Sequence, residues 1–185
     1  MSDLVGRVSG DMNSLQKILS KIPGFKGYVD RTNRRAADKL LRETIANHFE
    51  EQWRRLSGIE ANMANQGALA QIQNLERAAI KLRQFIDRIR TASYGYAGFF
   101  DAIKINQDEL NQVYQYDLAM LELVDEVSRA IDNVEASLGT DGLQAAINNV
   151  TTQAQKCLDV FNRRTETMIG GVSGAEVPTT PPPQP

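Results

Sequence analysis

The chain has few of the residues that most often carry catalytic or redox chemistry. It contains one cysteine and one histidine in 185 residues, and aromatic residues make up 6% of it. Cys157 alone excludes an internal disulfide, and one imidazole cannot supply the paired histidines of a di-metal site in a helix bundle. The sequence also lacks a cysteine cluster and a nucleophile-elbow motif. It therefore predicts no metal site, no bound cofactor and no catalytic residues.

Long hydrophobic runs are also missing. No apolar stretch approaches the roughly 18 residues that a membrane-spanning helix requires. The opening residues, MSDLVGRVSGDMNS, lack the basic start and apolar block that are typical of a secretory signal. Hydrophobic residues make up 42% of the chain, but β-branched residues rarely occur together. The composition predicts an all-helical protein, and we expect it in a reducing cytoplasm.

Heptad patterns are the main feature that is present. Apolar residues recur at alternating steps of three and four, which is typical of helices packed lengthwise on one another. The clearest stripes cover residues 72–89, 110–138 and 143–161, and a looser one covers residues 37–56, with Gly58 and Gly67 bracketing its end. The short segment SLGTDG, residues 137–142, indicates antiparallel neighbours. We therefore expect an elongated antiparallel four-helix bundle.

Two further segments lie outside this pattern. Apolar residues spaced by four and three predict an amphipathic N-terminal helix over residues 1–22. Residues 170–185 are rich in Gly, Thr and Pro, which predicts a disordered tail after a bundle of residues 23–169. The sequence leaves open whether the first helix packs on the bundle or binds a membrane.

Basic residues gather near the start of the predicted second helix. Residues 1–95 hold 16 Lys and Arg against 10 Asp and Glu, whereas residues 96–185 hold 5 against 13. Cations at a helix N-terminus oppose the helix dipole, so a negative charge elsewhere must favour them. That charge is either acidic residues of the fourth helix or an external anion, meaning lipid headgroups or an acidic protein. Nucleic acid is disfavoured because no aromatic residues interleave the basic ones. The acidic candidates are Asp125, Glu126, Asp132 and Glu135, and the candidate anion or partner face is Lys26, Arg31, Arg34, Arg35, Lys39 and Arg42.

Two aromatic segments interrupt the helices. PGFKGY does not match the phosphate-binding loop G-x-x-x-x-G-K-[ST], so it is interpreted as a connector that Pro23 begins. TASYGYAGFFDAIKI, residues 91–105, has no helical period and is too apolar to be fully solvated. Both segments are expected at one end of the bundle, where they would form a shared cap or shallow groove. The candidate groove residues are Phe25, Tyr28, Tyr94, Tyr96, Phe99 and Phe100.

Three single residues stand out within the stripes. Asp117 occupies a heptad core position, so it needs a partner, which is an Arg or Lys of a neighbouring helix or the hydroxyl of Tyr94 or Tyr96. A contact that fixes helix register is the main interpretation, and a catalytic or proton-binding Asp117 is the alternative. His48, beside Ile45 and Phe49, is expected to be half-buried, and Cys157 to act as a small hydrophobic side chain.

Four short segments carry a resemblance to a known group. IPGFKGY with ADKLLR, followed by YGYAGFFDAIKI and YQYDL, resembles a pattern in small, functionally uncharacterised bacterial all-helical proteins. The resemblance implies an association with stomatin- or prohibitin-like membrane scaffolds, and it assigns no site residue. The amphipathic start before a long helical rod is also similar in outline to phage-shock-type membrane-remodelling proteins.

These observations favour a non-catalytic interaction or scaffold protein rather than an enzyme. We expect a protein partner, with the cytoplasmic face of a membrane as a second candidate because basic residues lie beside the amphipathic first helix. One alternative is a small-molecule-binding or enzyme-like bundle that uses the aromatic end groove. Another is a self-assembling structural protein, a homo-oligomer, because heptad stripes also pair between chains.

Overall fold

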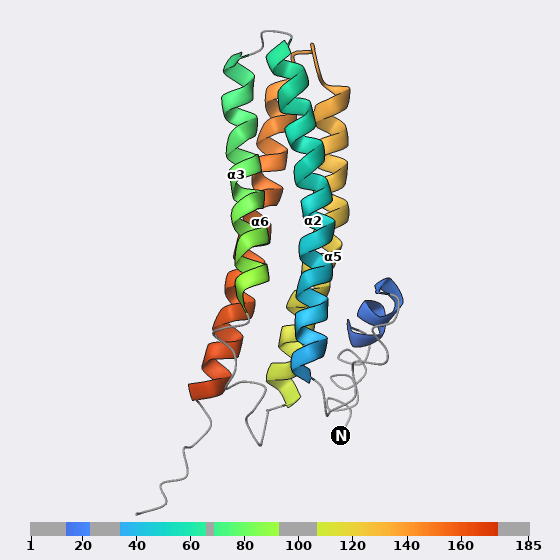
Figure 1. Cartoon of the computed structure of the whole chain (residues 1–185), viewed down its shortest axis with the longest axis vertical. Helices are drawn as coiled ribbons and strands as arrows, with labels where there is room; N and C mark the ends of the chain where they lie inside the picture. The colour runs from blue at the N-terminus through green and yellow to red at the C-terminus, as the bar shows by residue number, and fades with distance from the viewer. Residues whose placement is uncertain (1–13, 23–33, 66–68, 93–106, 174–185) are drawn as a thin grey trace, which may run out of the picture.

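The computed structural model describes residues 14–22, 34–65, 69–92 and 107–173, and no strand occurs among them (Figure 1). The four long helices are α2 (Arg34–Asn65), α3 (Leu69–Thr91), α5 (Gln107–Ala136) and α6 (Leu143–Ser173). A short helix covers residues 14–21. The predicted all-helical bundle with an additional N-terminal helix is confirmed. The helix α6 includes the first residues of the predicted tail.

The four long helices run alternately up and down the bundle (Figure 1). The main contacts are α2 with α3, α3 with α6, α6 with α5, and α5 with α2, so α3 and α5 lie on a diagonal. The bundle therefore consists of two antiparallel hairpins, α2–α3 and α5–α6. Their two mutual seams, α3–α6 and α2–α5, join helices that run in the same direction, and the α2–α5 seam is the less extensive.

The core follows the heptad stripes. Each long helix contributes fully buried side chains at steps of three and four, such as Leu75, Leu82 and Ile86 of α3. The ring of Phe85 packs edge-on against Phe49 at 4.7 Å and against Phe161 at 6.2 Å between ring centroids. Each such side chain contributes about 1.5–3 kcal/mol on full burial. The stripes therefore determine which face of each helix turns inward.

The short N-terminal helix packs on the bundle. Ile18 is 0% exposed and Ile22 is 4% exposed, and both belong to the main core. Leu15 and Leu19 pack against the same core. These four residues stand at i, i+3, i+4 and i+7, which is one face of a helix. The structure therefore shows residues 14–22 packed on the bundle.

Two glycines near helix ends differ in their backbone requirements. Gly58 and Gly67 were expected to bracket the end of their helix, and this is confirmed, because α2 passes through Gly58 and ends at Asn65. An exposed helical glycine costs only about 1 kcal/mol relative to alanine, and the flanking Leu56 and Ile59 are buried. Gly139, in the predicted turn between α5 and α6, has a φ of 76°, a value that favours glycine.

None of the helices within the described ranges is long and apolar enough to cross a membrane.

Substitution of these two glycines is expected to have opposite effects on stability. A Cβ added at Gly58 meets no atom within 4 Å, so Gly58→Ala should stabilise the protein by about 0.4–1 kcal/mol through improved helix propensity. Gly139→Ala should destabilise it by about 1 kcal/mol because alanine resists a positive φ. Chemical denaturation of both variants measures the difference. Equal shifts in the same direction would contradict the assigned backbone conformations.

Candidate functional site

A buried cluster of four charged side chains crosses the lower part of the bundle. Arg164 of α6 is 0% exposed, Asp117 of α5 is 1% exposed, and Arg42 of α2 is 2% exposed. Asp38, one turn before Arg42 on α2, has a side chain that is 8% exposed. We call Asp38, Arg42, Asp117 and Arg164 the ion network.

The charges of the ion network alternate along a chain of contacts. The Nε atom of Arg164 donates to Oδ1 of Asp117 at 2.6 Å, and its Nη2 atom donates to Oδ1 of Asp38. The other carboxylate oxygen of Asp38 accepts from Nε of Arg42 at 2.8 Å. The Nη1 atom of Arg42 then donates to the backbone carbonyl of Ile89 in α3 at 2.9 Å. The network therefore joins all four long helices, including the diagonal pair α2 and α6.

Burial and pairing act in opposite directions on the central ion pair. Burial raises the pKa of Asp117, and the nearby charge of Arg164 opposes that rise. Burial alone would lower the pKa of Arg164, but Asp117 and Asp38 outweigh it and hold the Arg164 pKa above its ordinary value. Arg164 is therefore charged, and both carboxylates owe their place in the interior to it.

The ion network also divides the apolar interior. A small cluster of Leu110, Val113 and Met168 lies apart from the main core. The Nη1 atom of Arg164 donates to Sδ of Met168 at 3.0 Å, so the guanidinium touches this second cluster. Within the described part of the chain, no atom of the network is among the buried polar atoms that lack a partner. Its chemistry is therefore that of a saturated structural contact.

Asp117 was singled out from its heptad position, and the structure pairs it with an arginine of a neighbouring helix. Its partner Arg164 was not anticipated, although a signal existed. The stripe Ala154, Cys157 and Phe161 continues by a step of three to Arg164 and then by four to Met168. Arg164 therefore occupies a core position by spacing alone, which was the available clue to a partner for Asp117. Asp38 was not singled out, because the looser stripe of its helix was taken to run through Ala37 and Leu41.

The predicted basic face is only partly exposed. Arg42 does not belong to it, because its side chain is buried in the ion network. Arg35 is exposed, and so is Lys39, whose Nζ atom lies 3.7 Å from Glu43 in the next turn. Lys26, Arg31 and the side chain of Arg34 lie outside the described residues.

The acidic residues of α5 are paired with cations, but not with those of the predicted face. Asp125 contacts Lys21 of the short helix at 3.7 Å, and Glu126 contacts Lys156 of α6 at 3.5 Å. A second arginine of α2, Arg55, reaches both of the remaining candidates, Asp132 and Glu135. Acidic α5 is therefore held by three neighbouring elements. The expected complementarity of basic and acidic helices is present, with different basic partners.

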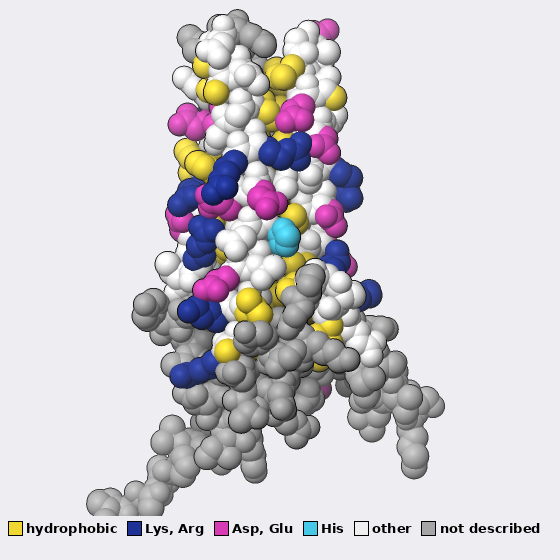
Figure 2. Space-filling view, turned by 45° about the vertical axis from the view of Figure 1, so that its right-hand side comes forward, with side chains coloured by type: hydrophobic (Ala, Val, Ile, Leu, Met, Phe, Trp, Pro, Cys, Tyr) yellow, Lys and Arg dark blue, Asp and Glu magenta, His cyan; other side chains and the backbone are white. Residues whose placement is uncertain are grey.

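The remaining candidates fall in three places. The aromatic groove residues Phe25, Tyr28, Tyr94, Tyr96, Phe99 and Phe100 all lie outside the described residues. His48 was expected to be half-buried, and this is wrong: it is exposed, and Figure 2 shows the one histidine at the surface among interleaved acidic and basic side chains. Cys157 is 0% exposed, and burial raises the pKa of its thiol to about 12. In the part of the chain that the structure covers, no three His, Cys, Asp or Glu side chains form a metal-binding group.

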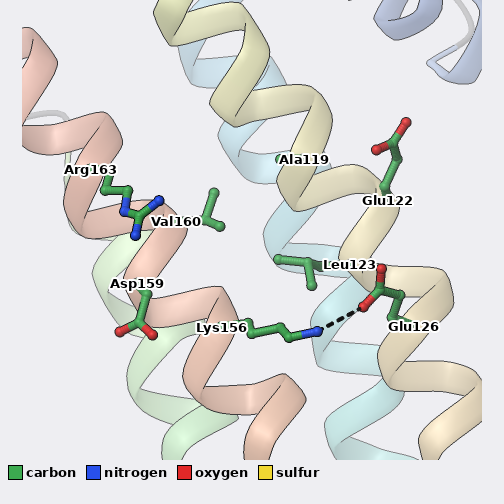
Figure 3. Close-up of a pocket in the computed structure, with 8 residues that line it drawn as sticks. All are labelled: Ala119, Glu122, Leu123, Glu126, Lys156, Asp159, Val160 and Arg163. Carbon is green, nitrogen blue, oxygen red and sulfur yellow. Dashed lines mark ion pairs between the residues drawn. The ribbon is translucent and has the colours of Figure 1, made fainter.

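A shallow groove runs between α5 and α6 on the outside of the bundle (Figure 3). It has a volume of about 330 Å³. Leu123 of α5 and Val160 of α6 point into the space between the helices, and Lys156 reaches across to Glu126 at one end. The other lining residues are Ala119, Glu122, Asp159 and Arg163. An apolar floor with charged edges suits a protruding side chain of another protein better than an enclosed small molecule.

Comparison of the chain with protein-family models, with curated proteins and with solved structures finds no match. The resemblance to small bacterial all-helical proteins stays a hypothesis.

Breaking the ion network on one side is expected to cost more than removing the central pair. Asp117→Asn should destabilise the protein by about 3–5 kcal/mol, because it leaves the buried Arg164 short of one negative partner. Asp117→Leu combined with Arg164→Leu should cost less than the sum of the two single changes, since no uncompensated charge remains between them. Denaturant unfolding of the unaltered protein, of Asp117→Leu, of Arg164→Leu and of the double variant measures the coupling between the two residues. Asp125→Asn, which alters an exposed pair, is the control, and strictly additive effects would contradict the network.

The carboxylate of Glu60 in α2 lies in an electrostatically unfavourable environment. Its Oε1 atom is buried without a hydrogen-bond partner. Burial raises the pKa of Glu60 above its ordinary value of 4.5, and the charge of Glu76 adds to the rise. Because the folded state holds this proton more tightly than the unfolded state, ionised Glu60 destabilises the fold at neutral pH.

Glu60→Gln is therefore expected to stabilise the protein at pH 7. The advantage should shrink as the pH falls through the raised pKa of Glu60, and it should reach its minimum below about 4.5, where both states hold the proton. Thermal unfolding of both proteins across the acid range tests this, with Glu51→Gln, an exposed change on the same helix, as the control. A stabilisation that does not change with pH would show that ionisation of Glu60 is not its cause.

Proposed function

We propose that this protein is a non-catalytic interaction protein, a scaffold or adaptor, whose bundle receives an amphipathic helix beside α5. The observation that carries the proposal is the short helix of residues 14–21. It is a separate amphipathic element, outside the four long helices, whose Ile18 and Ile22 pack into the main core. In this proposal a helix of a partner protein competes for the same place.

The covered surface is defined by residues of α5. Leu118 and Leu121 precede Asp125 by seven and four residues, so they share its side of the helix. They are 7% and 6% exposed, and Asp125 pairs with Lys21 of the short helix. The short helix therefore lies near the side of α5 on which Leu118 and Leu121 are buried. Figure 1 shows it beside the lower half of the bundle, next to α2 and α5.

The attachment of the short helix is mainly apolar. Two fully buried isoleucines contribute about 1.5–3 kcal/mol each. The ion pair of Lys21 with Asp125 joins side chains that are 39% and 64% exposed, and such surface pairs contribute little. An isolated helix of this length is marginal in water, so its helical state depends on the contact. A contact of a few kcal/mol is within the range that an intermolecular helix can replace.

An amphipathic partner helix is favoured over a membrane as the competing ligand. The apolar face of residues 14–22 is already satisfied by protein, and the site on α5 is an apolar surface with acidic Asp125 at its edge. Such a surface fits a helix with apolar residues at i, i+3, i+4 and i+7 and a basic residue beside them, a common mode of peptide recognition. Acidic Asp125 would repel an anionic lipid surface.

The proposal predicts that opening the site creates a peptide receptor. In the full chain, Ile18→Asp combined with Ile22→Asp should release the short helix, because a carboxylate cannot enter the apolar contact without a partner. A fluorescent peptide of residues 14–22 should then bind this variant at least about tenfold more tightly than it binds the unaltered chain. In the unaltered chain the tethered helix competes at a high effective concentration. Fluorescence anisotropy measures both affinities.

Two controls sharpen this experiment. Gln16→Asp alters an exposed position of the same helix and should leave peptide binding as weak as in the unaltered chain, and a peptide carrying both Asp substitutions should not bind. Absence of peptide binding by a folded double variant would refute the proposal. Co-sedimentation of the unaltered chain with anionic vesicles, lost in the double variant, would replace it with a membrane-binding function.

A further inference from the structure

The turn between α5 and α6 holds the one Asp-Gly pair of the sequence, Asp141–Gly142, and the sequence has no Asn-Gly pair. Both residues are exposed. The backbone nitrogen that follows an aspartate can close a five-membered ring with the carboxyl carbon of that side chain. Glycine leaves this nitrogen accessible, because it has no side chain to hinder the approach. The pair is therefore a candidate for a reaction within the chain itself.

One hydroxyl group restrains the reactive nitrogen. The backbone N–H of Gly142 donates to Oγ1 of Thr140 at 3.2 Å, and the same hydroxyl donates to the backbone carbonyl of Ser137 at 2.8 Å. Thr140 thus closes a turn around Asp141 through its side chain, a local arrangement that threonine favours. The nitrogen that would attack Asp141 is the one that Thr140 holds, so ring closure requires this hydrogen bond to break.

The other restraints on the pair are hydrogen bonds at the start of α6. The N–H of Leu143 donates to the carbonyl of Thr140 at 3.3 Å, and the N–H of Ala146 donates to the carbonyl of Gly142 at 3.1 Å. Thr140, Asp141 and Gly142 are all exposed, and the turn lies at the end of the bundle opposite the ion network (Figure 1). The turn can therefore open locally while the core of the bundle stays folded.

We propose that Asp141 is a site of spontaneous isomerisation to isoaspartate, and that the hydroxyl of Thr140 sets its rate. In the first step the nitrogen of Gly142 loses its proton and bonds to Cγ of the protonated Asp141 carboxyl group, whose hydroxyl leaves as water. In the second step water opens the resulting cyclic imide at either carbonyl. Opening at Cγ restores aspartate, and opening at the backbone carbonyl gives isoaspartate. The water lost is regained, so the reaction needs no oxidant, reductant or other reactant.

Isoaspartate changes the covalent path of the turn. The chain then runs through Cβ and Cγ of residue 141, which adds one carbon atom to the backbone between α5 and α6. The longer path moves Gly142 away from its present position relative to Thr140 and Ala146, so the hydrogen bonds of the turn are weakened. The modification uses neither residues 14–22 nor their site on α5, so it stands independently of the proposed helix receptor.

Prolonged incubation of the full chain at neutral pH and body temperature tests the proposal. A peptide that contains residues 141 and 142 should accumulate as a second form of equal mass, which chromatography separates and electron-transfer fragmentation identifies as isoaspartate. Thr140→Ala should raise the initial rate by about twofold to tenfold, because it removes two hydrogen bonds that oppose opening of the turn. Absence of isoaspartate at residue 141 in both proteins would overturn the site. Equal rates in the two proteins would overturn the role of Thr140.

Three control variants separate local opening from other routes. Asp141→Glu keeps the charge but would require a less favourable six-membered ring, and Gly142→Ala hinders the nitrogen, so both should suppress the reaction. The fold accepts Gly142→Ala, because an added Cβ would lie 3.5 Å from Oγ1 of Thr140, an ordinary contact. Ile86→Val lowers the stability of the whole fold through the buried core of α3 and should leave the rate unchanged. Acceleration by Ile86→Val equal to that by Thr140→Ala would show that the reaction follows global unfolding, and would overturn control by Thr140.

Discussion

The position of Arg164 between two carboxylates is the constraint on which the lower half of the bundle depends. A guanidinium that is 0% exposed requires negative partners, and Asp117 and Asp38 supply them from two different helices. Asp38 then requires Arg42, which in turn takes the carbonyl of Ile89. Each group is acceptable in the interior only because the next one is in place. Apolar packing tolerates small slips between helices, whereas this chain of directional contacts fixes one register for all four.

The carboxylates of the acidic helix α5 distinguish its surroundings from those of α3. Its carboxylates meet cations on the short helix, on α6 and on α2, so α5 is held from several sides. On the other seam, α3 presents Lys81 and Arg88 to the side-chain carbonyls of Gln155 and Asn162 rather than to carboxylates. The two seams therefore differ in polarity. That difference specifies which helix lies beside which, because exchanging α5 with α3 would bring like charges together.

Most of the fold could be predicted from the heptad stripes, because burial of an apolar stripe depends on local spacing alone. They located the four helices, the turn after α5 and the interior position of Asp117. Sequence reasoning failed where a contact between distant residues decides the outcome. Arg42 sits in a basic run and was assigned to the surface, yet Asp38 and Ile89 hold it inside. The diagonal placement of α3 and α5 has no local signal at all, since it follows from which helices pair across the bundle.

The position of the ion network along the rod has a mechanical consequence. The first long helix begins at Arg34 and the last ends at Ser173, and both of these ends lie at the same end of the bundle. A pulling force applied at Arg34 and Ser173 would therefore peel α2 and α6 away from that end turn by turn. Asp38 and Arg164 lie close to it and are bonded directly to each other. The ion pair between them therefore resists such a load first, and the apolar core further along the bundle is loaded only after this ion pair breaks.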